Sequence, residues 1–301
     1  MRSTVLVAFS GDPAPAEFAR VIAGVLDAGV TTVTVDGAEE PDEAPRVRAG
    51  TRVERASSAA AGLQRLIAAE QPVLTVLGSS ATAGHGRVAL GTTAERVLHG
   101  AGRAVAVVPR GHGERALGTI GVGLLPTPES LRALHAAACL SRAAGVPLLV
   151  LTVLRRSPDL ADATELAARL APTTPASTRG SAASILGAAI AAAAREGGDA
   201  WERGPHEAAH DPAASDLAAA AARVTRRRAA RAVVEPLVLV GDAADALIRT
   251  TARLGLLVLG SRTYGPPGVV LPGGAARRVL AAARCPVLLV PRAQSALSAA
   301  A

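Results

Sequence analysis

The chain has 301 residues, half of them apolar, and its formal net charge is +7. Lysine is absent, so arginine supplies the positive charge. The only aromatic residues are Phe9, Phe18, Trp201 and Tyr264, a scarcity that argues against single-stranded nucleic-acid binding, in which bases stack on exposed rings. The length predicts two domains, each able to bury an aliphatic core.

Short aliphatic runs alternate with helical periodicity in the first part of the chain. Strands are expected at 4–9, 31–35, 48–55, 73–77 and 104–108. Helices are expected at 15–28, 58–70 and 92–98, the first of them ending at Gly29. The strand runs lack strict polar alternation, which predicts an α/β fold with a parallel sheet covered by helices on both faces.

The second part of the chain has the same order of elements. Strands are expected at 119–125, 146–154, 233–240, 256–259 and 287–290, with a first helix at 129–144. Pro13 aligns with Pro128, whereas later blocks align at a larger offset, so an insertion is expected at about 155–230. Helical patterns within it occur at 160–170, 181–195 and 214–230. The expected domains are therefore 1–112 and 117–295.

An internal repeat supports this division. Residues 76–110 and 258–292 align without a gap at an offset of 182, and 16 of these 35 positions are identical. A shared stretch of this length predicts two copies of one folding unit.

The end of each copy contains a candidate ligand site. Gly78-Ser79 ends a strand and Gly91-Thr92 begins a helix, and the second copy has Gly260-Ser261 and Gly273-Gly274 at the same places. Glycine lets the backbone approach a ligand closely, and a helix N-terminus offers free N–H groups to a phosphate. In open parallel sheets, ligands bind beyond the carboxyl ends of the strands.

These residues resemble the universal stress protein family, whose nucleotide-binding members carry G-x2-G-x9-G-[ST] before the last helix. Gly78, Ala81, Gly91 and Thr92 keep that spacing, as do Gly260, Thr263, Gly273 and Gly274. The segments beginning at Cys285 and Gly241 are similar to two further family motifs. The resemblance implies two Rossmann-like domains of five parallel strands, packed like the family's usual dimer, and ATP or AMP as a ligand.

The sequence departs from the family pattern in both copies. The second motif glycine is replaced by Ala81 and Thr263, and the last Ser/Thr by Gly274. The family's Asp after the first strand aligns with Ser10 and Leu125. Both sites are therefore interpreted as degenerate nucleotide sites, the second more so than the first. In the alternative interpretation, the glycines bind no ligand and only shape a tight connection between strand, loop and helix.

If nucleotide binding persists, it is expected in the first domain. Gly78, Ser79, Gly91 and Thr92 would then lie at the phosphates, Ser10 near the sugar and Val35 near the base. From these features, the chain is interpreted as a cytoplasmic stress or regulatory protein without catalytic residues.

Two enzyme alternatives remain open, a nucleotide hydrolase and a zinc hydrolase. His206, Glu207 and His210 match the H-E-x-x-H pattern of zinc proteases. Two prolines bracket this motif and no compelling third ligand follows, so a surface segment is the preferred interpretation and no metal is expected.

Other features point to a reduced, intracellular setting. Cys139 and Cys285 lack metal-ligand spacing and are expected to be buried thiols, and no signal peptide or membrane span is predicted. The arginines at 226–228 are interpreted as a solvated helix face, with a patch for nucleic acid or an acidic partner as the alternative. Arg110 could bind an acidic ligand or solvate a chain exit, and the second interpretation is preferred. The final strand of each domain is expected at a sheet edge, where a protein partner or a second copy could pair.

Overall fold

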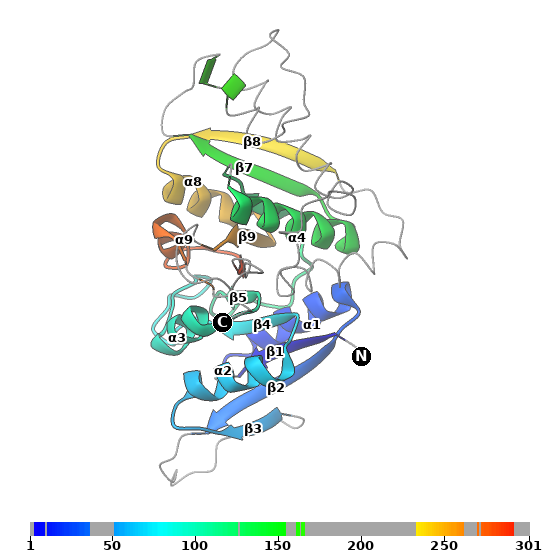
Figure 1. Cartoon of the computed structure of the whole chain (residues 1–301), viewed down its shortest axis with the longest axis vertical. Helices are drawn as coiled ribbons and strands as arrows, with labels where there is room; N and C mark the ends of the chain where they lie inside the picture. Colours follow the sequence, from blue (N-terminus) through cyan, green and yellow to red (C-terminus); the bar gives the residue numbers. More distant parts are fainter. Residues whose placement is uncertain are drawn as a thin grey trace, which may run out of the picture.

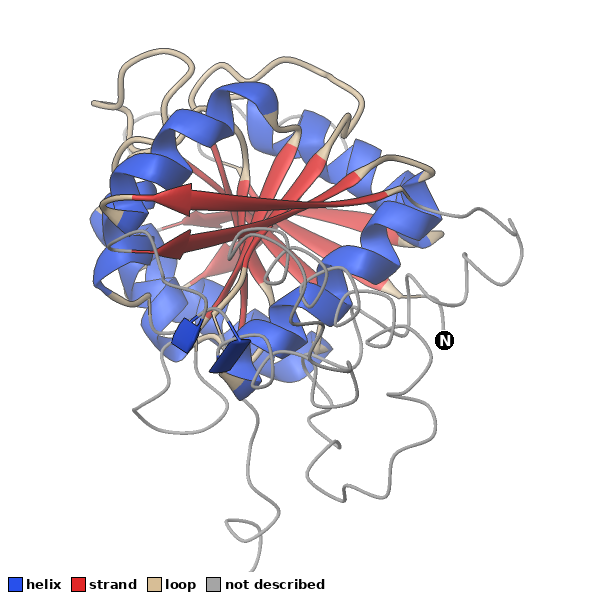
Figure 2. Ribbon diagram, turned by 90° about the horizontal axis from the view of Figure 1, so that it is seen from above, coloured by secondary structure: helices blue, strands red, loops and turns tan. Residues whose placement is uncertain are grey.

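The computed structural model describes residues 3–9, 11–36, 51–125, 127–154, 161–162, 164–165, 233–261, 270 and 272–291. Within these residues, ten strands form one continuous sheet with helices on both faces (Figures 1 and 2). The aliphatic runs of the sequence become strands because helices cover them on both sides, which keeps their side chains from water.

The first half of the sheet follows the predicted order of elements. Its strands are β1 (Thr4–Ala8), β2 (Gly29–Asp36), β3 (Thr51–Arg55), β4 (Leu74–Gly78) and β5 (Val105–Val108). Its helices are α1 (Ala14–Leu26), α2 (Ala59–Glu70) and α3 (Thr92–Gly100).

The second half repeats this arrangement. Its strands are β6 (Ile120–Gly123), β7 (Leu148–Leu154), β8 (Val234–Val240), β9 (Leu256–Gly260) and β10 (Val287–Val290). Its helices are α4 (Pro128–Ala144), α8 (Ala243–Thr250), the 3-10 helix η2 (Thr251–Arg253) and α9 (Gly274–Val279). Most of the expected insertion at 155–230, including two of its three helical patterns, lies outside the described residues.

The strands lie in the order β3-β2-β1-β4-β5-β10-β9-β6-β7-β8. Neighbours are parallel within each half, and only β5 and β10 pair antiparallel, with Leu288 opposite Ala106. The predicted fold of five parallel strands in each half is thus confirmed. Each final strand is the edge strand of its own half, as predicted, and the two final strands pair with each other, so that β3 and β8 are the outermost of the described strands.

Local residues explain where several helices begin and end. The Ser58 hydroxyl accepts a hydrogen bond from Ala61 N at the start of α2, and the Thr127 hydroxyl accepts one from Ser130 N at the start of α4. The expected end of α1 at Gly29 was wrong. The left-handed residue is Asp27, with φ of 50°, and Gly29 already begins β2.

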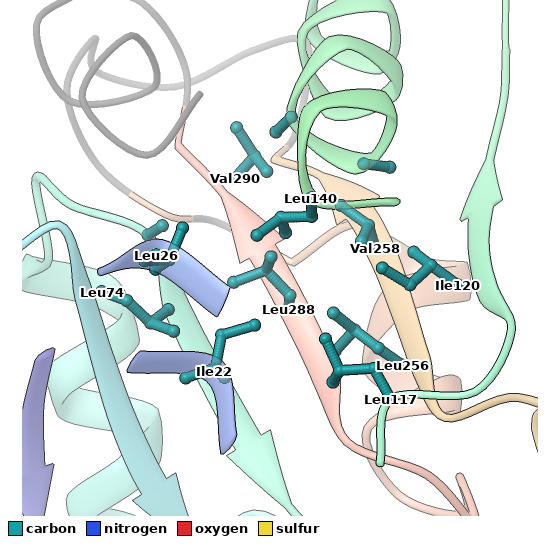
Figure 3. Packing of buried hydrophobic residues seen from close by; sticks show 14 of the residues in the cluster. Ile22, Leu26, Leu74, Leu117, Ile120, Leu140, Leu256, Val258, Leu288 and Val290 are labelled. Carbon is teal, nitrogen blue, oxygen red and sulfur yellow. The ribbon is translucent and has the colours of Figure 1, made fainter. Parts of the chain in front are cut away.

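One hydrophobic cluster crosses the seam between the two halves. Figure 3 shows Leu288 of β10 with Ile22 of α1 on one side and Leu256 of β9 on the other. Helices α1 and α4, which both contribute to this cluster, also contact each other across the boundary between the two halves. Cys139 and Cys285 are buried free thiols, as expected. A second hydrophobic cluster also contains residues of both β5 and β10, so the two halves share buried side chains in both clusters.

Among the helices of the described residues, none combines the length and apolar character needed to cross a membrane.

Candidate functional site

Each half has a cavity beside the connection that the sequence singled out. The first cavity, of about 820 Å³, lies at the carboxyl ends of β1, β2 and β4 and reaches the start of α3. The second, of about 280 Å³, lies at the matching ends of β6, β7 and β9, beside the start of α9. Their positions agree with the general location of ligand sites in open parallel sheets.

The structure brings most of the predicted residues to these cavities. The first is lined by Val35, Gly78, Ser79, Gly91 and Thr92, and the second by Gly260, Ser261, Gly273 and Gly274. Ser10 and Thr263 lie outside the described residues.

Ser79 shapes the loop that follows β4. Its hydroxyl donates a hydrogen bond to Val108 O (2.7 Å) and accepts one from Ala89 N (3.3 Å). Ser80 N donates to Ala89 O at 2.8 Å, so the loop returns toward its own start. The Ser79 side chain therefore fixes the wall of the first cavity.

The N-terminus of α3 faces the first cavity. Gly91 is the residue before the helix, and no side chain caps the first turn. A Cβ on Gly91 would lie 3.7 Å from Ser80 Cβ, an ordinary contact. The protein would thus tolerate a side chain here, and the glycine instead leaves the uncapped N–H groups and their partial positive charge accessible.

Arg110 lines the first cavity. Its Nη1 donates hydrogen bonds to Ala81 O (2.6 Å) and Ala83 O (3.1 Å) across the loop after β4. Arg110 is exposed, as the preferred interpretation expected, and its guanidinium also binds carbonyl groups of the loop. It brings a permanent positive charge to the cavity wall.

Asp12 is the acidic residue of the first cavity. Its Oδ1 accepts a hydrogen bond from Ala14 N and its Oδ2 one from Gly111 N, both at 3.0 Å. The carboxylate therefore ties the start of α1 to the chain after β5. Its position directly before Pro13 at a helix start was the sequence signal that could have found it.

An apolar wall closes the other side of the first cavity. Val35 of β2 and Leu63 of α2 line it. A Cβ on Gly62 would lie 2.7 Å from Val35 Cγ1, so the glycine lets β2 and α2 approach closely. The first cavity thus combines an apolar wall with a polar end.

The second cavity has a different character. Its described lining includes Leu125, Leu151, Val153, Leu247 and Leu259, and no charged side chain among the described residues lines it. Leu125, aligned with the family's acidic position, is 56% exposed at the rim.

Polar groups of the second cavity are engaged within the protein. The Ser130 hydroxyl accepts a hydrogen bond from Leu125 N (2.8 Å) and donates one to Gly123 O (3.1 Å). A Cβ on Gly260 would lie only 2.7 Å from Glu129 O. This glycine is therefore needed for the close approach of β9 to α4, whether or not a ligand binds.

An exposed ion-pair cluster joins α8 to α9 near the second cavity. Arg278 Nη1 contacts both carboxylate oxygens of Asp242 at 2.9 Å, and its Nη2 contacts Asp245 at 2.7 Å. The hydrogen bond from Asp245 N, followed by those from Arg278, lowers the pKa of Asp242 below its ordinary value.

Reciprocal hydrogen bonds connect each loop to the opposite half. Val88 N donates to Ala283 O (2.8 Å), and Val270 N donates to Ala101 O (3.1 Å). These pairs are equivalent at the repeat offset of 182. Arg87 Nη1 adds a bond to Ala282 O at 3.0 Å, so the loop at the first cavity is anchored on the second half.

No group of three or more His, Cys, Asp or Glu side chains within the described ranges is placed to share a metal ion. His206, Glu207 and His210 lie outside those ranges.

Comparison with known proteins gives a consistent assignment. A model of the universal stress protein family matches residues 117–291. A universal stress protein structure from Pseudomonas aeruginosa UCBPP-PA14 is similar with a TM-score of 0.55 and 17% identity, covering 96% of this chain and 93% of that one. One from Archaeoglobus fulgidus DSM 4304 has a TM-score of 0.56 and 14% identity, covering 96% and 98%. At these identities the structures share the fold. No curated protein matches the chain in sequence.

Proposed function

This chain belongs to the universal stress protein family, and from that premise we propose that it is a non-catalytic stress-response or regulatory protein that binds ATP or AMP in its first cavity. The second cavity takes no nucleotide in this proposal.

The proposal rests on one observation: the first cavity has a positively charged end and an apolar end. At one end lie the uncapped start of α3 and the guanidinium of Arg110. At the other lie Val35 and Leu63. A phosphate is stabilised by the first set, and an adenine ring buries its faces against the second.

The size of the cavity supports the same assignment. Its volume of about 820 Å³ lies within the range of roughly 300–1,000 Å³ typical of small-molecule sites. The second cavity, at about 280 Å³, lies at the lower limit and lacks a cationic side chain among its described lining. In this proposal, the backbone of Gly78 and of the loop held by Ser79 lies close to the phosphates of the nucleotide.

A charge placed at the start of α3 tests the proposal. Thr92 is exposed at the first helical position, where an acidic residue stabilises a helix, so Thr92→Glu should fold. At an effective dielectric constant of about 20, unit charges about 5 Å apart repel by about 3 kcal/mol, and screening reduces this to a loss of about tenfold in affinity.

Isothermal titration of the full chain with AMP and ATP measures this loss. Thr92→Gln has a similar size without the charge and should retain affinity. Gly274→Glu places the same charge at the equivalent position of the second cavity and should also bind normally. Equal affinity of Thr92→Glu and Thr92→Gln, or a loss in Gly274→Glu alone, would refute the assignment to the first cavity.

A further inference from the structure

The second cavity, which has no part in the nucleotide proposal, has features of a binding site for another class of molecule. It lies among leucine and valine side chains of β7, α8 and β9, and Leu125 extends this apolar lining to the rim. An apolar side chain that is 56% exposed beside a cavity loses contact with water when a ligand covers it, which favours binding.

The charge of the ligand follows from the lining. No Arg, His, Asp or Glu side chain of the described residues reaches the cavity. A charged ligand would therefore lose hydration without gaining an ionic partner, and this cost is large in an apolar site.

The hydrogen bonds already present point the same way. The Ser130 hydroxyl binds Leu125 N and Gly123 O, and the Thr127 hydroxyl accepts a bond from Ser130 N at 3.3 Å. Gly260 packs against the backbone of Glu129. Of the family-motif residues in the second half, Gly260 is thus held by internal packing, and the neighbouring hydroxyls of Ser130 and Thr127 are already hydrogen-bonded within the protein.

The size of the ligand follows from the volume. A dry apolar cavity of about 150 Å³ accommodates benzene, and this cavity measures about 280 Å³. We infer that the second cavity binds a small uncharged aliphatic molecule of roughly ten carbon atoms, a class chemically distinct from the nucleotide assigned to the first cavity.

Decanol and decanoate form a matched pair of probes, because they have the same chain length and differ in charge. Each is titrated into the full-length protein with 13C-labelled leucine methyl groups. Decanol should shift the resonances of Leu151, Leu247 and Leu259 saturably, and decanoate should bind about tenfold more weakly.

Two equivalent alanines provide matched variants. Ala243 is the first residue of α8 and lines the second cavity, and Ala59 is the first residue of α2 and lines the first. Ala243→Phe should abolish the decanol shifts by filling the site, whereas Ala59→Phe should leave them intact. Val153→Phe fills the same cavity from β7 and serves if Ala243→Phe does not fold.

Several results would overturn the inference. These are equal binding of decanol and decanoate, decanol binding that survives both filling variants, the absence of a saturable shift up to the solubility limit of decanol, or shifts of the same methyl groups by AMP. Failure of the nucleotide proposal would appear separately, as the absence of AMP and ATP binding with decanol binding unchanged.

Discussion

Gly260→Ala tests whether the motif glycine of the second half serves packing. The added Cβ would lie 2.7 Å from Glu129 O and 2.9 Å from Glu129 C, well inside the 3.4 Å at which ordinary contact begins. Both atoms are backbone at the start of α4, so neither can rotate away. Overpacking of this kind costs about 1–3 kcal/mol, and reduced freedom of the unfolded chain offsets about 0.4–1 kcal/mol. We therefore expect a net loss of roughly 1–2 kcal/mol in the free energy of unfolding.

Urea denaturation followed by circular dichroism measures this loss, and a fall of a few degrees in Tm should accompany it. Gly274→Ala is the control, because no heavy atom lies within 4 Å of its added Cβ, and it should be neutral or slightly stabilising. If Gly260→Ala unfolds at the same urea concentration as the parent chain, α4 does not restrict this position and the packing explanation is wrong.

Two further predictions concern titrating groups. Burial raises the pKa of the Cys285 thiol to about 12, so peptide mapping after iodoacetamide treatment at pH 8 should find Cys285 labelled only in unfolded protein; labelling of the native chain at the rate of a free thiol would contradict this. Hydrogen bonds lower the pKa of Asp242 in the folded state, so its contribution to stability is present above its ordinary, unfolded pKa and is lost as pH falls through the lowered value. Arg278→Ala should therefore lower the urea midpoint relative to the parent chain at pH 6, and this difference should shrink at acidic pH and in high salt; a difference that does not change with pH would argue against the ion-pair cluster.

The sequence predicted the sheet because its signal is local. Runs such as Leu74–Gly78 and Leu256–Gly260 are aliphatic without alternation, which indicates strands covered on both faces. The antiparallel pairing of β5 with β10 was not predicted, since a strand's periodicity carries no information about its partner. The sequence predicted each final strand as a domain edge where a second copy could pair, and this is where the two halves meet.

The candidate sites were predicted only in outline. The glycine spacing located both cavities, yet Gly260 is constrained by Glu129 in a helix distant in sequence. The hydrogen bonds of Arg110 were not predicted because its partners, Ala81 O and Ala83 O, lie nearly thirty positions away. Asp12 was overlooked because alignment by offset directed attention to Ser10. In each case a contact between distant segments decides the role, and single-sequence patterns do not contain such contacts.

The seam between β5 and β10 has an evolutionary consequence. Two identical subunits that met in this way would carry the same pocket twice, and any substitution would alter both copies at once. Joining the halves in one polypeptide removes that constraint, because codons for Thr92 and Gly274, or for Ser10 and Leu125, change independently. Among the described residues, charged side chains accordingly line the pocket of the first half and not that of the second, an asymmetry that no symmetric homodimer can have.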